Sequence, residues 1–355
     1  MGKARWESWS GLSSDWPPWC CWRGGTTAAA DNTARGSPVT AIAADSAGIA
    51  RAVALLRAGG IVALPTETVY GLAADARNAK AVARIYAAKG RPGFNPLIVH
   101  VVDLAAAEQL VIVGATARAL AARFWPGPLT LVLPAREGNG IVPIVAAGMS
   151  TLAVRVPAHP VMQAILSRIG QPLAAPSANA SGAISPTTAA HVAASLGDRV
   201  PLIIDDGATP GGLESTIVAV DGDWVTLLRP GAIAADRLGV VTDAAAFPGS
   251  AGQGVTAPGQ LASHYAPRQP VRLNAESAAA NEFLVGFGSV RGDVTLSATG
   301  DLGEAAAALF AALHIAQASG AVVIAVAPIP EIGVGVAIND RLRRAAYRRS
   351  ADPRH

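Results

Sequence analysis

From residue 46 onward, the order of apolar and polar residues divides the chain into segments of two kinds. Apolar residues spaced three and four positions apart predict amphipathic helices. We place these helices at 46–60, 78–88, 103–111, 115–124, 159–169, 187–196, 302–318 and 338–347. Short apolar runs predict strands at 61–64, 96–102, 129–133, 151–156, 172–175, 201–204, 215–220, 224–228, 271–273, 283–286 and 321–326. Because strands and helices alternate, the sequence predicts an α/β protein.

Two segments interrupt this alternation and set the expected domain boundaries. Residues 1–37 hold five of the seven tryptophans but have no helical or strand period, so we expect a disordered extension. Residues 241–260 carry one charge among many Ala, Gly and Pro residues, which is typical of a linker. The expected organisation is a larger α/β domain at 38–240, a linker at 241–268 and a small α/β domain at 269–347.

The composition of the 355 residues fits a folded interior, since 51% of them are hydrophobic and 15% are charged. No apolar run reaches the roughly 18 residues that a membrane-spanning helix needs, so we expect a soluble protein without a membrane contact. Cys20 and Cys21 are adjacent, which excludes a CxxC pair and disfavours a disulfide within one domain. This cysteine usage fits a reducing, cytoplasmic setting.

The charge distribution argues against a nucleic-acid-binding surface, although the pI is near 9.1. Residues 61–231 contain twelve Lys or Arg and eleven Asp or Glu, so no polycationic face is expected there. Much of the positive excess lies near the C-terminus, and we interpret it as a solvated helix end rather than a binding site. The residues of this cluster are Arg341, Arg343, Arg344, Arg348 and Arg349.

The predicted strand 61–64 is followed by Pro65, Thr66, Glu67 and Thr68, which place two hydroxyls and a carboxylate at a strand end. Pro and Thr commonly end strands, so an ordinary turn is one interpretation. A functional loop is the other, because loops at strand ends often carry binding residues. This segment alone does not decide between the two.

Two predicted strands carry a basic side chain among apolar residues. In the strand 151–156, Thr151 and Arg155 share one face because side chains alternate. An Arg inside an apolar strand needs an anion, either a protein carboxylate or a ligand. In the strand 96–102, His100 lies on the face opposite Leu97, Val99 and Val101, and it is either a hydrogen-bonded core residue or a site residue.

Lys89, Arg91 and Asn95 lie together in "AKGRPGFNPL", where two prolines restrict the loop. Cations at a helix C-terminus stabilise the helix dipole, which is one explanation for Lys89 and Arg91. The other is that an ammonium, a guanidinium and an amide on a rigid loop bind a polyphosphate.

The segment "PSANASGAISPTTAA" is a second loop of small polar residues, including Ser177 and Asn179. Ser185 and Pro186 predict a helix start, with Ser185 as the N-cap and Pro186 at the first helical position. Backbone N–H groups at such a start bind anions, so Ser185 either caps the helix or contacts a phosphate. There is no Walker loop, no GxGxxG motif and no metal-ligand spacing.

The order of the motifs "PTETVYGL", "KGRPGFNPLIVH", "TLAVRVPAHP", "APSANASG", "SPT", "ESTIV" and "LRPG", followed by "PGQLASHYAP" and "AINDRLRRAA", is more specific than any one motif. Over residues 45–347 the chain resembles the two-domain form of the YrdC-type threonylcarbamoyl-adenylate synthases. The resemblance implies a YrdC-like twisted open mixed sheet flanked by helices, with a smaller Rossmann-like C-terminal α/β domain.

The resemblance also implies an enzyme, a nucleotidyltransferase that joins L-threonine, bicarbonate or CO2, and ATP into L-threonylcarbamoyladenylate and pyrophosphate. The product feeds the N6-threonylcarbamoyl modification of tRNA adenosine, through a tRNA threonylcarbamoyl transferase machinery. Mg²⁺ is expected to arrive held by the ATP phosphates, with no protein metal site and no organic cofactor.

Matching positions take their expected roles from the family. Pro65 and Thr66 shape the pocket floor, and Lys89 and Arg91 are the expected catalytic cations. The expected threonine-binding residues are Thr68, His100, Arg155 and Ser215. The expected ATP-binding residues are Lys89, Arg91, Asn95, Thr151, Ser177, Asn179, Ser185, Arg229, His264 and Tyr265. The linker is expected to fold over the site, although Leu261, Ala262 and Ser263 replace the Lys-Tyr-Arg run of many relatives.

Two other function classes remain as alternatives. One is a module that binds double-stranded RNA or tRNA, which the near-neutral charge over 61–231 disfavours. A weak contact with tRNA is the most that we expect of the synthase itself. The other is a carbamoyl-transfer domain of the hydrogenase-maturation type, which works beside zinc-finger and acylphosphatase-like domains. The chain has neither the cysteines nor the length for those additional domains.

Overall fold

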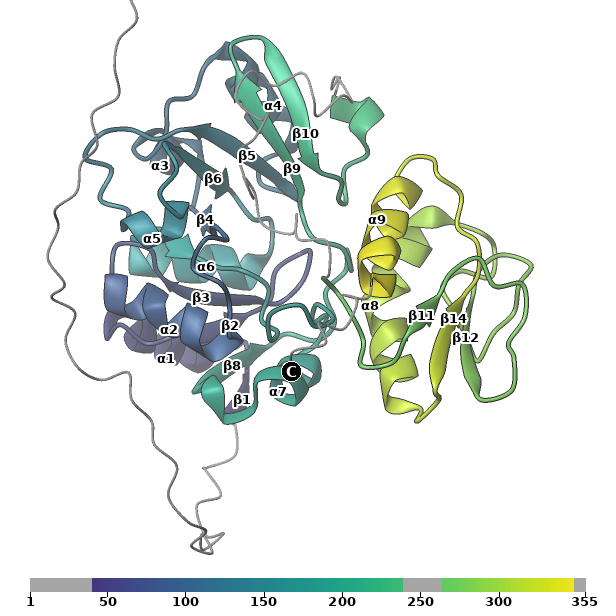
Figure 1. The fold of residues 1–355 in the computed structure, drawn as a ribbon. Coiled ribbons are helices and arrows are strands. Elements are labelled where there is room, and N and C mark those ends of the chain that lie inside the picture. Colours follow the sequence, from purple (N-terminus) through teal and green to yellow (C-terminus); the bar gives the residue numbers. More distant parts are fainter. Residues whose placement is uncertain (1–39, 239–263, 348–355) are drawn as a thin grey trace, which may run out of the picture. The chain divides into compact units, whose positions relative to one another are not determined.

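The computed structural model describes residues 40–238 and 264–347, which belong to one compact unit, Ser37–His355. The expectations for residues 1–37 and for most of the linker at 241–268 lie outside the described residues. Figure 1 shows the described segments as coloured ribbons. Among the helices of these two ranges, none combines the length and the apolar content that spanning a membrane requires.

The first described range folds around a ten-stranded mixed sheet (Figure 1). Its strands, in spatial order, are β1 (Thr40–Ala43), β8 (Leu202–Asp205), β2 (Val62–Leu64), β3 (Gly71–Asp75), β7 (Leu173–Ala174), β4 (Ile98–His100), β6 (Thr151–Arg155), β5 (Leu129–Pro134), β9 (Thr216–Asp221) and β10 (Trp224–Arg229). The pairs β1·β8, β8·β2, β4·β6 and β5·β9 are parallel, and the others are antiparallel. The expected mixed sheet is therefore confirmed.

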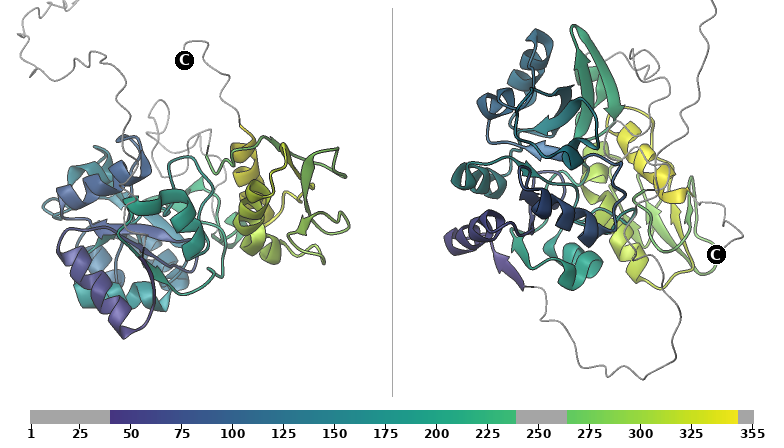
Figure 2. Two further views of the ribbon diagram at one scale, coloured as in Figure 1. Left: turned by 90° about the horizontal axis from the view of Figure 1, so that it is seen from below. Right: turned by 60° about the vertical axis from the view of Figure 1, so that its left-hand side comes forward.

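Helices cover both faces of this sheet, as the two views in Figure 2 show. The helices are α1 (Ser46–Arg57), α2 (Ala79–Lys89), α3 (Leu104–Glu108), α4 (Ala115–Phe124), α5 (Pro143–Ala146), α6 (Pro160–Ile169) and α7 (Ala189–Leu196). Strand alternation explains the two faces, because Val62 and Leu64 pack with α1 and α6, whereas Ile61 and Ala63 pack with α2, α4 and α7. Short 3₁₀ turns lie at Gly197–Arg199 and Ala235–Leu238.

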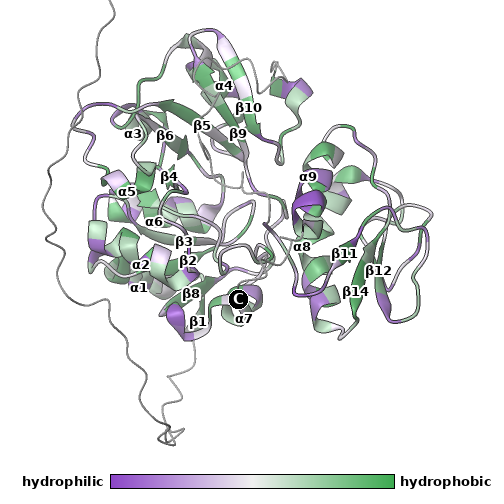
Figure 3. Cartoon of the chain, viewed as in Figure 1, coloured by the Kyte–Doolittle hydropathy of each residue, from purple (hydrophilic) through white to green (hydrophobic). Residues whose placement is uncertain are grey.

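The second described range forms a four-stranded parallel sheet with two helices. The strands, in spatial order, are β11 (Val271–Arg272), β14 (Val323–Val326), β12 (Glu282–Gly286) and β13 (Val294–Thr295), and the helices are α8 (Leu302–Ala318) and α9 (Gly335–Ala346). Figure 3 shows α9 with hydrophilic residues beside hydrophobic ones. Its apolar residues Ile338 and Leu342 join the core that also contains Leu309 and Leu313 of α8. Parallel strands and helices agree with the expected small α/β domain.

Most of the predicted elements are present, and the bounds of α4 and α8 agree with the predicted ones. The prediction missed β1, β3, α5 and β13. The predicted helix start at Ser185 is wrong, because α7 begins at Ala189 and its N-cap is Thr188, whose Oγ1 accepts from the N–H of His191. Pro186 is outside the helix, and its carbonyl accepts from the N–H of Tyr70 instead.

Candidate functional site

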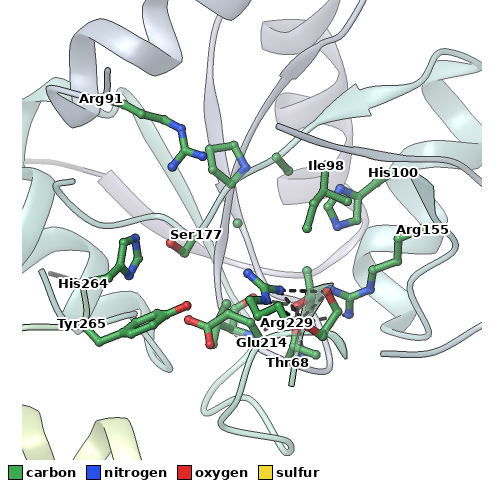
Figure 4. Close-up of a pocket in the computed structure, with 16 residues that line it drawn as sticks. Thr68, Arg91, Ile98, His100, Arg155, Ser177, Glu214, Arg229, His264 and Tyr265 are labelled. Atoms are coloured by element: carbon green, nitrogen blue, oxygen red, sulfur yellow. Dashed lines mark hydrogen bonds between the residues drawn. The ribbon is translucent and has the colours of Figure 1, made fainter. Parts of the chain in front are cut away.

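One pocket collects most of the residues that the sequence singled out. We call it the central pocket, and Figure 4 shows its side chains. Its lining residues are Thr66, Thr68, Val69, Gly71, Arg91, Ile98, His100, Arg155, Ala175, Pro176, Ser177, Glu214, Ser215, Arg229, His264 and Tyr265.

The turn after β2 is held by its own threonines. Thr66 Oγ1 accepts hydrogen bonds from the N–H groups of Thr68 and Val69 and donates to the carbonyl of Val69 at 2.6 Å. The hydroxyls of Thr66 and Thr68 lie 2.8 Å apart, and both side chains are buried. These local bonds fix the turn, so that the Thr68 hydroxyl has a defined place in the pocket wall.

Arg155, at the end of β6, binds this turn across the sheet. Its Nη1 and Nη2 each donate to Thr68 Oγ1 over 3.1 Å, and Nη2 donates to Glu67 Oε1 over 2.6 Å. Burial alone raises the pKa of Glu67, but the charge and hydrogen bond of Arg155 hold it below its ordinary value. The sequence left a protein carboxylate or a ligand as the partner of Arg155, and the structure shows that Glu67 is one partner.

His100 lies beside Arg155, because the parallel strands β4 and β6 pair these two residues in register. Burial, and next the charge of Arg155, lower the pKa of His100 to about 3. The imidazole is therefore neutral at physiological pH. Its Nδ1 has no hydrogen-bond partner among the described residues, so this atom is available to a polar ligand.

Lys89, the last residue of α2, is buried beneath the loop that contains Ser177 and Asn179. Its Nζ donates to the carbonyl oxygens of both residues. Burial, and next the charges of Arg91 and Arg199, lower the pKa of Lys89 well below its ordinary value. Lys89 therefore holds this loop through hydrogen bonds to its backbone and does not line the central pocket.

Arg91 follows α2 and lines the central pocket. Its Nε donates to the carbonyl of Asn95 at 3.2 Å, and Nη2 donates to that of Pro96 at 2.8 Å. Burial lowers the pKa of Arg91 to about 10, so the guanidinium stays charged at neutral pH. Asn95 is fully buried outside the pocket lining, and neither of its side-chain amide atoms has a partner among the described residues.

Arg229, at the end of β10, binds the start of the neighbouring strand. Its Nη2 donates to the carbonyl of Ser215 at 2.8 Å and to Oγ of the same residue at 3.1 Å. Ser215 Oγ lies 2.7 Å from Thr130 Oγ1. Position 231 needs a glycine, because a Cβ there would lie 2.5 Å from backbone atoms of residues 214–216 and would push this strand start away.

Glu214 is a pocket residue to which sequence reasoning gave no role. It is 6% exposed, and its Oε1 accepts from Ser185 Oγ at 2.5 Å. Its Oε2 accepts from Nε of Arg341 at 3.0 Å. The interpretation of Arg341 as part of a solvated helix end is therefore wrong, since this residue is fully buried in an ion pair. Exposed Arg343 on the same helix, which pairs with Glu331, fits that interpretation.

His264 and Tyr265, which belong to the second described range, also line the central pocket. Their rings meet edge to face with centroids 4.1 Å apart. Burial, and next the charge of Arg91, lower the pKa of His264 well below its ordinary value, so the ring is neutral. Burial raises the pKa of Tyr265, whose buried hydroxyl has no partner among the described residues. A neutral ring pair and a buried hydroxyl can receive a planar base or a polar group.

The structure thus brings nine predicted site residues to one pocket. They are Thr68, Arg91, His100, Arg155, Ser177, Ser215, Arg229, His264 and Tyr265. It does not place Lys89, Asn95, Thr151, Asn179 or Ser185 in the pocket lining. Among these, Lys89 and Ser185 act on lining residues through hydrogen bonds. The sequence held one signal for Glu67 and Glu214. Each of them immediately precedes a predicted binding residue, Thr68 or Ser215.

The lining residues divide into two groups (Figure 4). One side of the view holds Arg91, Ser177, His264 and Tyr265, and the other holds His100 and Arg155. Three guanidinium groups and one carboxylate line the pocket, so its lining is cationic. Such a lining suits anionic ligands. Within residues 40–238 and 264–347, no group of three His, Cys, Asp or Glu side chains is placed to hold a metal ion.

Comparison with known proteins matches two family models to the chain. The model described as "Telomere recombination" (Sua5, YciO and YrdC) matches residues 54–231, and that of the threonylcarbamoyl-AMP synthase C-terminal domain matches residues 233–347. The chain is 39% identical to the Bacillus subtilis threonylcarbamoyl-AMP synthase over 325 residues, covering 84% of this chain and 92% of the relative. The Pyrococcus abyssi enzyme is also 39% identical, with 83% and 93% covered.

A solved structure of Pyrococcus abyssi Sua5 complexed with L-threonine matches with a TM-score of 0.75 at 37% identity. The match covers 84% of this chain and 94% of that one. These relatives span both described ranges, so the alternatives of an RNA-binding module and a hydrogenase-maturation domain are not favoured.

Proposed function

The chain belongs to the threonylcarbamoyl-AMP synthase family, and from this premise we propose that it is a nucleotidyltransferase that makes L-threonylcarbamoyladenylate. Its substrates are L-threonine, bicarbonate or CO2, and ATP, and pyrophosphate is the second product. The observation that carries the proposal is the central pocket, in which Arg155 and Thr68 lie beside a second cationic group that includes Arg91.

The side with Arg155 and His100 is the proposed threonine site. The Arg155 guanidinium is held by Glu67 and Thr68, and a charged, oriented guanidinium suits an amino-acid carboxylate. His100 offers a neutral imidazole with an unpartnered Nδ1, and Ser215 offers a hydroxyl. Threonine as a substrate is supported by the similar Pyrococcus abyssi protein, whose solved structure is a complex with L-threonine.

The side with Arg91 is the proposed ATP site. Arg91 and Arg229 supply charge for the phosphates, whereas His264 and Tyr265 supply aromatic surface for the nucleoside. Lys89 and Ser185 act indirectly here, through Ser177 and Glu214. We propose that Mg²⁺ enters with ATP as part of that substrate, bound to the phosphates, as Mg²⁺ commonly is in ATP-dependent enzymes.

The proposed chemistry needs positioning and charge stabilisation more than proton transfer. The neutral threonine amine adds to CO2, and the proton that its nitrogen then loses passes to solvent water, which gives a carbamate. A carbamate oxygen then attacks the α-phosphorus of ATP, and the bond from that phosphorus to the β-phosphate oxygen breaks. Pyrophosphate leaves with the bonding electrons. Arg155 keeps the threonine carboxylate away from the reacting end, while Arg91 and Arg229 stabilise negative charge on the phosphates.

The product is a mixed anhydride, which a threonylcarbamoyl transferase would consume when it modifies tRNA adenosine. We therefore propose a cytoplasmic location, where tRNA is the substrate of the following step. Any contact of this chain with tRNA is proposed to be weak, because Lys and Arg are nearly balanced by Asp and Glu over residues 61–231.

Incubation with ATP, Mg²⁺ and labelled bicarbonate, with and without L-threonine, tests the proposal. We expect pyrophosphate release and a labelled adenylate only when threonine is present. Release of pyrophosphate that does not depend on threonine, or no labelled adenylate under any of these conditions, would show that the proposed reaction is wrong.

A further inference from the structure

A buried arginine of helix α9 supports the wall of the central pocket without lining it. Arg341 of α9 is fully buried, and its Nε lies 3.0 Å from Oε2 of Glu214. Its Nη1 lies 2.7 Å from Oδ2 of Asp340. Burial alone lowers the pKa of Arg341, but Tyr265, Glu214 and Asp340 raise it above its ordinary value. Arg341 is therefore a cation that these neighbours hold in its charged form.

Glu214 joins this cation to the loop before α7. It lines the central pocket, and its other oxygen accepts the hydroxyl of Ser185 at 2.5 Å. A carboxylate this deeply buried is unfavourable without a counter-charge, and Arg341 supplies it. Without Arg341, Glu214 would lose its hydrogen-bonded cation at the wall of a pocket that we assign to polyphosphate.

Arg341 also contacts Tyr265, the last aromatic residue in the pocket lining. Its guanidinium carbon lies 5.0 Å from the centroid of the Tyr265 ring, which stacks on Phe310 of α8 at 5.5 Å. Tyr265 has a φ of 61°, a conformation that residues with a side chain rarely adopt. Surrounding contacts must hold such a residue in place, and those of Arg341 and Phe310 are available to do so.

Helix α8 packs closely on the same wall. A Cβ at Gly212, two residues before Glu214, would lie 2.3 Å from the carbonyl oxygen of Ala307 in α8. On the Ser185 side, Nε2 of His314 lies 3.1 Å from the Ser185 carbonyl oxygen. Helix α8 therefore contacts both segments that Glu214 connects.

We propose that Arg341 is a positioning residue of the active site, which neutralises Glu214 and fixes Tyr265 for nucleotide binding. Helix α9 thereby contributes to ATP binding, although none of its residues lines the pocket. This inference rests on the proposed function, which assigns the pocket wall near Ser185 and Tyr265 to ATP.

The test compares Arg341→Met with Arg343→Met. Both variants remove one arginine from α9, but Arg343 is exposed and pairs with Glu331 at the surface. KM values for ATP and threonine are measured well below the melting temperature of each variant, which circular dichroism determines. We expect Arg341→Met to raise the ATP KM by about tenfold or more, equivalent to about 1.4 kcal/mol, and to change the threonine KM far less. Arg343→Met should match the wild type.

Rescue by a second substitution separates charge compensation from simple packing. Glu214→Gln keeps an oxygen that accepts from Ser185 but removes the negative charge. In the Arg341→Met background it should restore most of the ATP affinity. If Arg341→Met fails to fold, Arg341→Lys takes its place, because it keeps the charge but loses the planar guanidinium. That variant should show a smaller rise in ATP KM, which Glu214→Gln does not reverse.

Three results would overturn the inference. They are an unchanged ATP KM in folded Arg341→Met, equal rises in the ATP and threonine KM values, and failure of Glu214→Gln to restore ATP affinity. Calorimetric binding of a non-hydrolysable ATP analogue to the same variants gives a readout that does not need turnover. A wild-type chain that binds this analogue but never makes an adenylate would refute the proposed function, while the comparison of variants would still decide the role of Arg341.

Discussion

Arg155 and Glu67 form an ion pair of 2.6 Å in the wall of the central pocket, and the same guanidinium donates to Thr68. The pair joins the end of β6 to the turn after β2. A ligand carboxylate that binds Arg155 must therefore share a guanidinium whose orientation the protein has already fixed. Such an arrangement favours ligands whose carboxylate lies at one position, because the guanidinium has little freedom to move towards a carboxylate at another position.

We expect Arg155→Ala to raise the threonine KM and to leave the ATP KM nearly unchanged. Loss of hydrogen bonds to a charged group costs about 1.5–3 kcal/mol, or roughly ten- to hundredfold in affinity. Steady-state kinetics with each substrate varied in turn measures both values. Arg51→Ala, at an exposed position of α1, is the control. Equal weakening of ATP and threonine binding would place Arg155 on the wrong substrate.

Lys89→Met should weaken ATP binding through the loop that Lys89 supports. The substitution leaves the carbonyls of Ser177 and Asn179 without their shared donor, which costs about 1–3 kcal/mol when such groups are buried. Calorimetry with an ATP analogue and thermal unfolding measure the two effects. Lys80→Met, at an exposed position near the start of the same helix, serves as the control. Intact ATP affinity in folded Lys89→Met would limit Lys89 to a stabilising role.

Gly231→Ala should lower both stability and activity. The added methyl group would lie 2.5 Å from the backbone of residues 214–216, so that strand and the side chains of Glu214 and Ser215 must shift. Overpacking of this kind costs typically about 1–3 kcal/mol. Gly93→Ala is the control, because a Cβ there meets no atom within 4 Å. Urea unfolding compares the variants, and equal midpoints would contradict the prediction.

Stability should fall as the pH is lowered, in part because of His314. Burial, and next the stacked ring of His191 with its centroid 3.8 Å away, lower the pKa of His314 from 6.5 to about 4. The unfolded chain then binds more protons than the folded chain between these values. The stability that this histidine contributes is complete above pH 6.5 and is lost as the pH falls towards 4.

His314→Gln should therefore reduce the dependence of unfolding free energy on pH within this window. One proton corresponds to a slope of at most about 1.4 kcal/mol per pH unit. Denaturant unfolding at several pH values between 4 and 7 measures the slope for both proteins. Parallel curves would mean that other groups dominate the acid sensitivity.

Local patterns predict those elements whose stability is local. Helix α8 has a long alanine-rich sequence, and Asp301 caps it by accepting from the N–H of Glu304. Strand β3, "GLAAD", has no β-branched residue, so its conformation depends on pairing with β2 and β7. Because tertiary pairing determines this strand, sequence reasoning missed it.

The site shows the same division between local and tertiary information. The alternation of β6 predicts that Arg155 needs an anion, but only the fold brings Glu67 next to it. Ser185 precedes a proline as a helix cap often does, yet its hydroxyl binds Glu214 far along the chain. Arg341 belongs to a cluster of arginines that looks like a solvated helix end in the sequence. Its burial depends on tertiary contacts, including the one with Glu214, 127 residues earlier in the chain.

The place of β8 in the large sheet has a consequence for how the chain is made. Leu202 and its neighbours in β8 pair with β1 on one side, beginning at Thr40, and Ile203 pairs with Ala63 of β2 on the other. During synthesis, β1 and β2 emerge long before the strand that lies between them. Their unpaired edges remain open to other chains while most of the domain is translated, a situation that favours misassembly. Slow translation between these strands should therefore reduce the yield of native protein more than slow translation after β8.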